Sequence, residues 1–345
     1  MDHNEGRARI QDVARRARVS IATASRSLNN FASVDVMLAN RVRRAADELD
    51  YIPNANAKAL AQGGSRLLGL IISESLAHLL PTFESFAARE EYSILIGFAD
   101  NTTPAVNRCM SRMLAQNVAG IAVVLPPEQN LSAALPLLGK TPLVSLAQGP
   151  IGPRSSILEV NYQSGMREAI RHLAALGHRD MALLNGPGAS HFCQQMLAAY
   201  RISLEDLGLS CGLGAILECD TTPENCAQVV RERMSHPHRP TAIIAADHPM
   251  AAAVLSAATD LGLRVPHDLS VVAFAGMRGD PPESPAMTSI EISTEDIVRA
   301  TLSALHIGRE RKNSQALNPL RVLTRLVIRQ STDQIRSFGE HPAIL

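Results

Sequence analysis

The chain has 345 residues, of which 46% are hydrophobic, and its 33 basic residues balance its 33 acidic ones. This length exceeds one typical domain and this apolar content suffices for a sizeable core, so two or three domains are expected rather than one small module. The N-terminal segment is polar, and no run of about 18 apolar residues exists. The composition therefore favours a cytoplasmic protein over an exported or membrane-spanning one.

The first predicted elements are two short helices around a tight turn, within the segment IQDVARRARVSIATASRSLNN. Apolar residues recur there at the spacing of a helix that buries one stripe, and we expect this first helix to end near Arg18. Ser20 is a favoured N-cap residue, because its hydroxyl can accept a backbone N–H that has no partner within the helix. A second helix is therefore predicted to begin at Ile21 and to end at Asn29 and Asn30.

The predicted helix pair matches the helix-turn-helix, whose second helix enters the major groove of DNA. Ala22 and Arg26 share the outer face of that helix, where an arginine can form two hydrogen bonds with a guanine. Between Arg7 and Arg44 there are nine arginines and two aspartates, a local excess of seven positive charges. Any small three-helix bundle can show capped amphipathic helices, and charge runs are usually solvated faces. The charge excess nevertheless favours a surface that contacts phosphates.

A third helix is predicted at residues 38–49, and three helices suffice to close a small core. The segment YIPNANAKAL follows at residues 51–60. Through IQDVARRARVSIATASRSLNN and YIPNANAKAL, the chain resembles the lactose-repressor (LacI/GalR) family of bacterial transcription regulators. The resemblance runs nearly end to end.

The resemblance implies a hinge segment after the helix-turn-helix, with a leucine that wedges between base steps in the minor groove. Leu60 stands at that position, and an apolar wedge there allows a bent duplex to contact more protein. A buried linker leucine is the alternative interpretation. The helix-turn-helix and the resemblance together predict DNA contacts at Ser20, Ile21, Ala22, Thr23, Ser25, Arg26, Asn29, Tyr51, Asn54, Ala57, Lys58 and Leu60.

Beyond Gln62, short uncharged apolar runs alternate with amphipathic stretches. Such runs are typical of parallel strands covered on both faces, and the alternation predicts doubly wound α/β domains. The expected strands lie at residues 67–72, 92–98, 119–125, 143–146, 181–184, 242–246 and 269–274. The expected helices lie at residues 106–116, 165–176, 194–207, 225–234 and 250–261.

The resemblance supplies the architecture that periodicity cannot. It implies an N-terminal all-α helix-turn-helix domain at residues 1–50, a hinge helix and linker at 51–65, and a two-lobed core at 66–340. The core is of the periplasmic-binding-protein-like type (type I), with doubly wound parallel sheets and a ligand cleft between the lobes. Lobe 1 is expected at about 66–159 and 288–318 and lobe 2 at about 160–287 and 319–336, joined by crossovers near 160, 285–290 and 318–321.

The resemblance also implies how the protein works. It implies a homodimer that binds a roughly palindromic double-stranded operator, with its DNA affinity controlled by a small-molecule effector. The C-terminal segment DQIRSFGEHPAIL has no leucine heptads, so nothing suggests a tetramer-forming coil. The expected function is therefore a sequence-specific transcription regulator, most often a repressor in this family.

The sequence shows no enzyme motif, and no cofactor or metal site is expected. It has no Gly-x-Ser-x-Gly elbow, no phosphate loop ending in Gly-Lys-Ser/Thr and no His-Glu-x-x-His. Its five cysteines have no paired or metal-like spacing, so free thiols in a reducing compartment are expected at Cys109, Cys193, Cys211, Cys219 and Cys226. Two alternatives stay open: a DNA-binding regulator that needs no ligand, and an α/β sugar-binding or sugar-modifying protein.

The expected ligand cleft departs from that of sugar-responsive relatives. Ala275 stands where the resemblance implies a ligand-binding aspartate, and Gln194 and Met196 stand in the region of a ligand-binding arginine. The loop at residues 73–83 is also shortened. Because each unsatisfied sugar hydroxyl would cost on the order of 1 to 3 kcal/mol, an ordinary free sugar is not expected.

Asp247 is the best remaining polar anchor in the expected cleft. The whole set of candidate effector-binding residues is Ser73, His78, Tyr162, Phe192, Gln194, Asp247 and Ala275. Core packing or loop ordering is the alternative interpretation of each.

Overall fold

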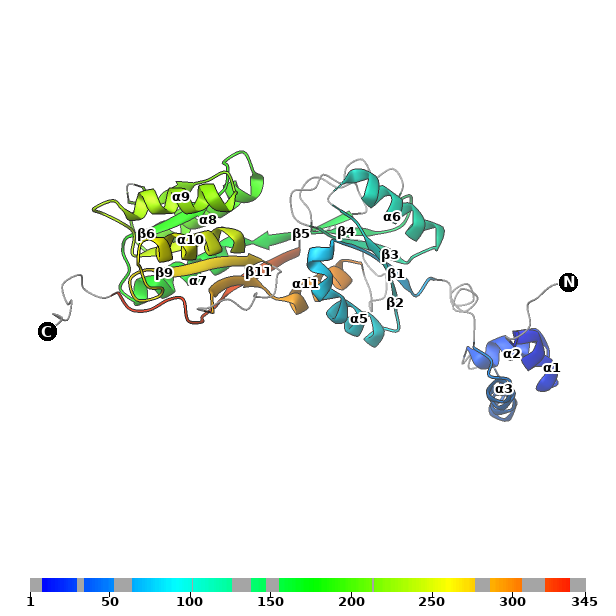
Figure 1. The fold of residues 1–345 in the computed structure, drawn as a ribbon. Helices are drawn as coiled ribbons and strands as arrows, with labels where there is room; N and C mark the ends of the chain where they lie inside the picture. The colour runs from blue at the N-terminus through cyan, green and yellow to red at the C-terminus, as the bar shows by residue number, and fades with distance from the viewer. Residues whose placement is uncertain are drawn as a thin grey trace. The chain divides into compact units, whose positions relative to one another are not determined.

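The computed structural model describes residues 8–29, 34–52, 64–100, 102–125, 138–146, 155–212, 214–276, 286–305 and 320–335. The chain divides into two compact units, Met1–Arg66 and Leu67–Leu345 (Figure 1). We call them unit 1 and unit 2 and describe each by itself.

Unit 1 is built from three helices, α1 (Ile10–Arg16), α2 (Ile21–Leu28) and α3 (Val36–Glu48). Arg18 lies between the first two helices with a φ of 51°, which reverses the chain in a conformation that non-glycine residues rarely adopt. The core of unit 1 is small and rich in alanine, which lets short helices approach closely. It consists of Val13, Ala14, Ala17, Ala24, Val42, Ala45 and Ala46.

Unit 2 contains two α/β halves. The first half consists of β1 (Leu67–Ile72), η1 (Glu74–Leu79), α5 (Leu80–Arg89), β2 (Ser93–Phe98), α6 (Thr103–Ala115), β3 (Gly120–Val124), β4 (Leu143–Ser145) and α11 (Thr294–Ala304). The second half consists of α7 (Tyr162–Ala175), β6 (Met181–Asn185), α8 (His191–Asp206), β7 (Ile216–Glu218), α9 (Pro223–Met234), β8 (Ala242–Ala245), α10 (His248–Asp260), β9 (Ser270–Gly276) and β10 (Thr288–Ile292). Strands β5 (Ser155–Asn161) and β11 (Leu320–Val327) join the halves.

The strands are hydrogen-bonded in the order β2-β1-β3-β4-β5-β11-β10-β9-β8-β6-β7. Within the described strands, neighbours are parallel except for the antiparallel pair of β10 and β11. The first part of β5 pairs with β4 and its last part pairs with β11, which in turn pairs with β10. Backbone pairing therefore runs without a break from one half to the other.

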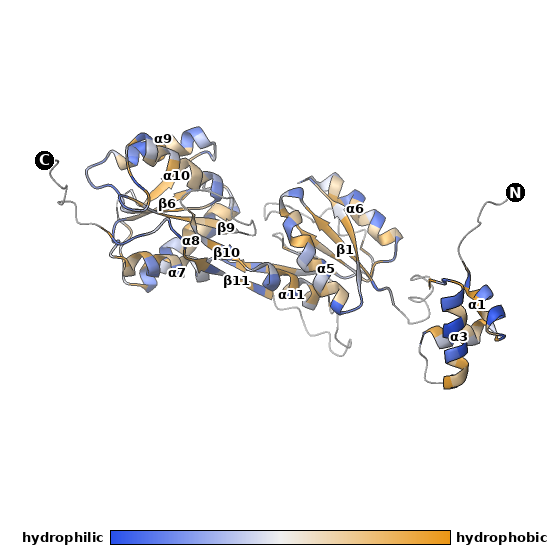
Figure 2. Cartoon of the chain, turned by 60° about the horizontal axis from the view of Figure 1, so that its bottom comes forward, coloured by the Kyte–Doolittle hydropathy of each residue, from blue (hydrophilic) through white to orange (hydrophobic). Residues whose placement is uncertain are grey.

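The sheet of the first half is covered on both faces, as the uncharged runs predict. In β1, Leu70 and Ile72 pack in one cluster with Phe83 of α5, whereas Ile71 packs in another with Met110 of α6. Figure 2 shows the strands of both halves as the most hydrophobic part of unit 2. The expectation of a helix-turn-helix domain followed by a doubly wound α/β core is confirmed.

One part of the expected lobe boundaries needs correction. The expected limits place residues 288–292 in lobe 1, but β10 at these residues pairs with β9 of the second half. The chain changes halves only after β10, because α11, which follows it, packs against α5. The cause is that β10 extends the sheet of the second half beside β9 before the chain returns to the first half.

Candidate nucleic-acid interface and ligand site

The start of α2 is fixed by its capping residue. The Ser20 hydroxyl oxygen accepts a hydrogen bond from the backbone N–H of Thr23 at 3.1 Å, which gives an otherwise unpaired amide a partner. The helix therefore begins at Ile21, as the sequence predicts. Ala24 and Ser27 are buried on its inner face, and this fixes which side chains point outwards.

The outer face of α2 presents Ile21, Ala22 and Arg26. Ile21 keeps 50% of its surface exposed, and Ala22 and Arg26 are also exposed. Arg26 forms neither a hydrogen bond nor an ion pair with any residue that the structure describes. None of its five N–H donors is used by a described residue, so the guanidinium group can bind another molecule.

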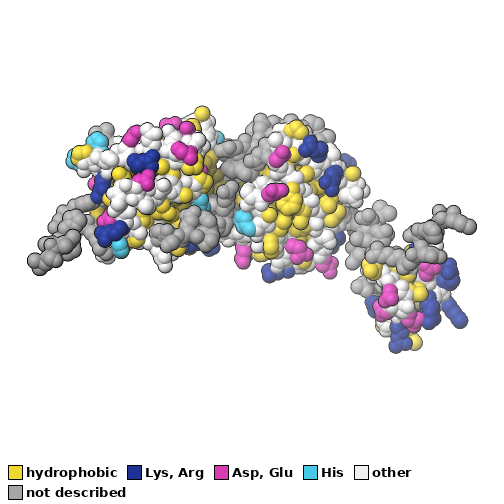
Figure 3. Space-filling view, in the orientation of Figure 1, with side chains coloured by type: hydrophobic (Ala, Val, Ile, Leu, Met, Phe, Trp, Pro, Cys, Tyr) yellow, Lys and Arg dark blue, Asp and Glu magenta, His cyan; other side chains and the backbone are white. Residues whose placement is uncertain are grey.

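Other arginines of unit 1 differ from Arg26. Arg15 lies 3.3 Å from Asp12, and Arg16 lies 2.5 Å from Glu48 of α3, so both take part in ion pairs on the surface. Figure 3 shows basic side chains gathered on the visible face of unit 1. Arg15 and Arg16 thus have partners on the surface of unit 1, whereas Arg26 has none among the described residues.

The remaining expected DNA contacts divide into two groups. Thr23 and Ser25 of α2 and its C-cap residue Asn29 are half-buried, and the Asn29 amide donates a hydrogen bond to the Ser25 hydroxyl at 3.4 Å. Tyr51 packs against the core of unit 1, and this burial raises the pKa of its hydroxyl. Asn54, Ala57, Lys58 and Leu60 lie outside the described residues.

Three aromatic rings meet in the second half of unit 2. The ring centroids of Tyr162, Phe192 and Phe274 lie 5.5 to 5.7 Å apart. Burial raises the pKa of Tyr162 to about 12, so its hydroxyl stays protonated at neutral pH. The structure thus brings two candidate ligand residues together with the residue that precedes Ala275, and the shared surface is aromatic.

The polar candidate residues of the second half form hydrogen bonds with backbone groups near them in the sequence. One carboxylate oxygen of Asp247 accepts the backbone N–H of Met250 at 2.7 Å and so caps α10. The Gln194 amide donates to the carbonyl oxygen of Gly188 at 2.8 Å. Each residue therefore has a structural role that would exist without any ligand.

Two residues of the expected ligand cleft, Met196 and Ala275, are buried. Met196 is 1% exposed and belongs to the core of the second half, and Ala275 is 5% exposed at the end of β9. Neither side chain carries a group that binds a hydroxyl strongly. The side chains of Met196 and Ala275 therefore offer no hydrogen bond to a ligand hydroxyl.

Candidates in the first half belong to the segment after β1. Ser73 is buried and lies 2.9 Å from the hydroxyl of Ser75, whereas His78 is exposed at the end of η1. The shortened segment is a 3-10 helix that continues directly into α5. Residues 74–89 are therefore helical throughout, and no irregular loop separates η1 from α5.

A pocket of about 210 Å³ lies beside Tyr162, and no local pattern in the sequence indicates it. Its walls include Gln195 and Ile202 of α8. The ion pair between Glu159 of β5 and Arg321 of β11, 3.4 Å apart, also lines it. Among the candidate effector residues, only Tyr162 contributes to this pocket.

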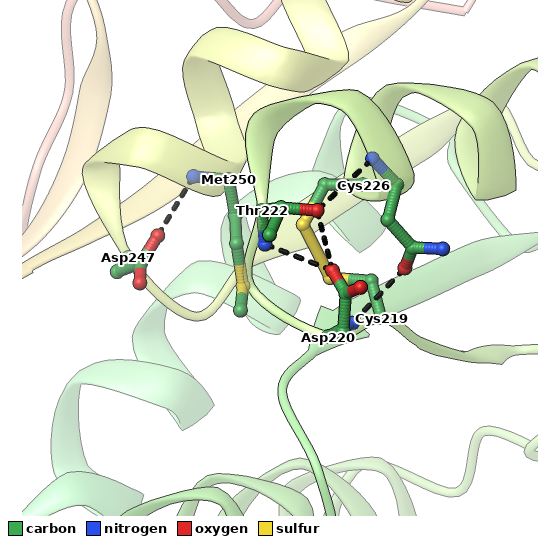
Figure 4. Close-up of a disulfide and its surroundings, with 7 residues drawn as sticks. Cys219, Asp220, Thr222, Cys226, Asp247 and Met250 are labelled. Atoms are coloured by element: carbon green, nitrogen blue, oxygen red, sulfur yellow. Dashed lines mark hydrogen bonds between the residues drawn. A yellow bond between two sulfur atoms is a disulfide. The ribbon is translucent and has the colours of Figure 1, made fainter.

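The expectation of five free thiols is wrong for one pair. Cys219 and Cys226 form a disulfide, with their Cα atoms 5.2 Å apart, whereas Cys109, Cys193 and Cys211 are free (Figure 4). The turn between β7 and α9 folds the chain back on itself, and this brings together two cysteines whose separation of seven residues matches no common motif. Among the residues that the structure describes, no cluster of three His, Cys, Asp or Glu side chains could hold a metal ion.

Family models match both units of the chain. Residues 9–54 match the model described as bacterial regulatory proteins, lacI family, and residues 170–332 match a periplasmic binding protein-like domain. Residues 9–54 are thus a lacI-family DNA-binding domain, which a periplasmic binding protein-like domain follows. Among the residues that the structure describes, no helix is long and apolar enough to span a membrane.

Individual relatives are similar to this chain along nearly its whole length. The HTH-type transcriptional repressor PurR of Klebsiella pneumoniae (strain 342) is 29% identical over 94% of this chain and 96% of its own length, and an Escherichia coli PurR is 28% identical over the same shares. The structure of the Lac repressor dimer bound to operator and the anti-inducer ONPF has a TM-score of 0.71 and 27% identity, covering 95% of this chain and 100% of that one. A complex of the transcriptional regulator CelR with cellobiose, at 22% identity and a TM-score of 0.60, shares the fold.

Proposed function

We propose that this chain is a LacI-family transcription repressor that binds a pseudo-palindromic DNA operator as a homodimer in the cytoplasm. The observation that carries the proposal is the outer face of α2, where capping by Ser20 leaves Ile21, Ala22 and Arg26 exposed. The Lac repressor, which matches the whole chain in fold, is a dimer bound to operator in its structure. An enzymatic role has no comparable support, since the similar PurR proteins are repressors.

Each exposed side chain on α2 suits a different feature of the major groove. Arg26 would form two hydrogen bonds with a guanine, and Ile21 and Ala22 would contact thymine methyl groups. The polar residues Ser20, Thr23, Ser25 and Asn29 would bind phosphates, and Leu60 would enter the minor groove. This division of roles gives both the affinity and the sequence preference of a helix-turn-helix reader.

The proposal also assigns a ligand class to unit 2. A small molecule would bind between the two halves, and it would be planar or apolar and carry fewer hydroxyls than a free hexose. The aromatic group of Tyr162, Phe192 and Phe274 supports this choice, as do the hydrogen bonds that already occupy Asp247 and Gln194. A polyol would find few groups here that could match its hydroxyls.

Selection from a random duplex library with the purified full-length chain tests the DNA-binding role. We expect an enriched, roughly palindromic site that is bound with a stoichiometry of two chains. Its affinity should fall roughly a thousandfold or more between low and physiological salt, because each neutralised phosphate releases counterions. Failure to enrich any site, with the chain folded, would refute the proposal.

A thermal-shift screen tests the ligand class. Nucleobases, aromatic acids, phosphosugars, monosaccharides and disaccharides would be compared, since a ligand at a hundredfold excess over Kd stabilises by about 2.7 kcal/mol. We expect stabilisation by a planar compound and none by a free hexose. A plain hexose that both raises the melting temperature and changes operator affinity would show that the ligand class is wrong, and the absence of any stabilising ligand would favour a ligand-independent regulator.

A further inference from the structure

The disulfide joins two elements at one edge of the second half. Cys219 directly follows β7, and Cys226 lies near the start of α9, where its N–H donates to the carbonyl oxygen of Thr222 at 3.0 Å. The parallel strands β6, β7 and β8 all end at this edge. In folds of this kind ligands bind outside the carboxyl ends of the strands, so the disulfide lies on the side where a ligand is expected.

The segment between the two cysteines is an exposed turn. Asp220, Thr221 and Thr222 are exposed, and the Asp220 carboxylate accepts hydrogen bonds from the backbone N–H and the hydroxyl of Thr222 at 2.9 and 2.6 Å. Thr221 has a φ of 73°, which is unfavourable for a β-branched residue. The turn is thus held in place by local bonds and covers two sulfur atoms whose residues are only 4% and 1% exposed.

Hydrogen bonds connect the disulfide to the neighbouring loop. The N–H of Cys219 donates to the carbonyl oxygen of Asn185 at 3.0 Å. The Asn185 amide donates in turn to the carbonyl oxygen of Cys193, in the first turn of α8, at 2.9 Å. Cys193 directly follows Phe192 of the aromatic group, so two hydrogen bonds separate the disulfide from a candidate ligand residue.

Close packing connects the same turn to α10. A Cβ atom added to Gly186 would lie 2.9 Å from the Cys193 sulfur, 3.1 Å from the Thr221 methyl carbon and 3.5 Å from the Met250 methyl carbon. The turn, α8 and α10 therefore all lie close to Gly186, the residue that follows β6. Figure 4 shows Met250 beside the turn that carries the disulfide, with the capping residue Asp247 on the far side of Met250. A shift of the turn would reach both helices that carry the candidate ligand residues.

We propose that Cys219 and Cys226 are a reversible thiol–disulfide site that controls the order of this carboxyl edge. In a reducing compartment, disulfides are usually transient and redox-sensing, and the surrounding turn is exposed enough to open locally. The oxidant class is a low-molecular-weight disulfide. The regulatory consequence rests on the proposed function, whereas the exchange chemistry does not.

The exchange balances without any further reactant. The Cys219 thiolate attacks the small disulfide, forms a mixed disulfide and releases one small thiolate. The Cys226 thiolate then attacks the Cys219 sulfur, closes the protein disulfide and releases the second small thiolate. The two cysteines lose two electrons in total, and the small disulfide gains them. The protons of the two protein thiols end on the two small thiols that are released.

Formation of the disulfide should order the ligand side of the second half. A closed turn holds Asn185, whose side-chain amide bonds to α8, and it keeps the Thr221 methyl group beside Gly186, which Cys193 of α8 and Met250 of α10 also approach. A preorganised site binds its ligand more tightly, because less order must be gained on binding. The oxidised protein is therefore the form with the higher ligand affinity.

Thiol mapping of the full-length chain tests the exchange directly. The protein would be equilibrated in glutathione buffers of varied ratio, quenched in acid and alkylated, and its peptides would be measured by mass spectrometry. We expect Cys219 and Cys226 to change together, in both directions, while the buried Cys193 stays a free thiol. If the pair remains reduced at every ratio, remains oxidised at every ratio, or links to other cysteines, the proposal is refuted.

Hydrogen exchange then tests the structural effect without DNA or ligand. Peptides that cover residues 186–194 and 247–254 should exchange at least threefold more slowly in the oxidised protein than in the reduced one. Cys226→Ala should abolish the difference, whereas Cys211→Ala, a change at an exposed free cysteine, should preserve it. Equal exchange of the oxidised and reduced wild-type protein would overturn the proposal without recourse to a variant.

Operator affinity separates this inference from the proposed function. On a selected duplex with a stabilising compound from the thermal screen present, the two redox forms should differ in Kd at least threefold. A chain that binds no DNA in either form would refute the proposed function and leave the thiol exchange standing. Equal affinities in the two forms would refute the regulatory role of the disulfide.

Discussion

On the outer face of α2, Arg26 is exposed and has no partner among the described residues, whereas at the carboxyl edge of the second half Asp247 and Gln194 are bonded to their own loops. The first surface exposes a guanidinium group that no described residue occupies. The second uses its polar groups to hold helix ends and turns, and it presents aromatic rings instead. The contrast indicates that a charged, hydrogen-bonding partner suits unit 1 and a less polar ligand suits unit 2.

The hinge provides the sharpest test of how unit 1 meets DNA. Leu60→Ala should lower operator affinity roughly tenfold or more and reduce DNA bending, because a wedge acts only on a distorted duplex. Fold and dimer should be unchanged. Circular-permutation gel shifts measure the bend. An unchanged bend would show that Leu60 does not insert between base steps.

Asp247 tests whether the carboxyl edge uses its polar groups only for structure. Asp247→Ala should lower stability by about 1 kcal/mol, since the cap of α10 is lost, whereas Asp247→Asn should keep the cap and the melting temperature. Thermal unfolding of the two variants without ligand measures this difference.

The asparagine variant then isolates the ligand contact. Asp247 could also bind the ligand through its charge. In that case a stabilising compound should raise the melting temperature of Asp247→Asn less than that of wild type, while the two unliganded proteins stay equally stable. If the compound raises the melting temperature of this variant as much as that of wild type, Asp247 only caps α10 and does not bind the ligand.

A smaller effect is expected from pH at the opposite edge of the second half. Burial lowers the pKa of His178. Its ring nitrogens lie 2.9 Å from the Thr241 hydroxyl and 3.0 Å from the Asp333 carbonyl oxygen. Nearby His172 lowers this pKa further, whereas Asp333 raises it. Because the folded pKa lies below the usual 6.5, the unfolded chain binds more protons in acid. Stability should therefore be fully present above that value and fall as the pH decreases through the folded pKa.

His178→Gln provides the matched comparison for the pH effect. Glutamine keeps a polar side chain at this position and does not titrate, so the melting temperature of the variant should depend less on pH across the same window. A wild-type protein whose stability rises on acidification through this range would contradict the assignment.

Much of the fold could be predicted because local and global signals agree. The hydroxyl of Ser20 marks the start of α2. The uncharged runs mark β1, β3, β6, β8 and β9, whose described residues are almost all buried. By contrast, β5 and β11 alternate buried and exposed positions and carry Glu159 and Arg321 on exposed faces. Such strands lack the uncharged run that marks a buried strand, so only the family resemblance indicated them, as crossovers.

The site was harder to predict than the fold. Ser20, Ile21 and Arg26 follow from helix spacing alone, because a short capped helix has one buried face. The pairing of Cys219 with Cys226 depends on how the turn at Asp220 folds back, and the aromatic group depends on three elements that are distant in sequence. Contacts of this kind arise from tertiary packing, and no local pattern indicates them.

The contrast between the two surfaces depends most directly on Arg26. The measurement is fluorescence anisotropy of wild type and Arg26→Ala on the selected operator and on a random duplex, at one salt concentration. The account predicts a loss of about 1 to 3 kcal/mol on the operator, that is, about tenfold to a hundredfold in Kd, with little change on random DNA. An equal loss on both duplexes would contradict it, because Arg26 would then contact phosphate alone and α2 would not read the sequence through this residue.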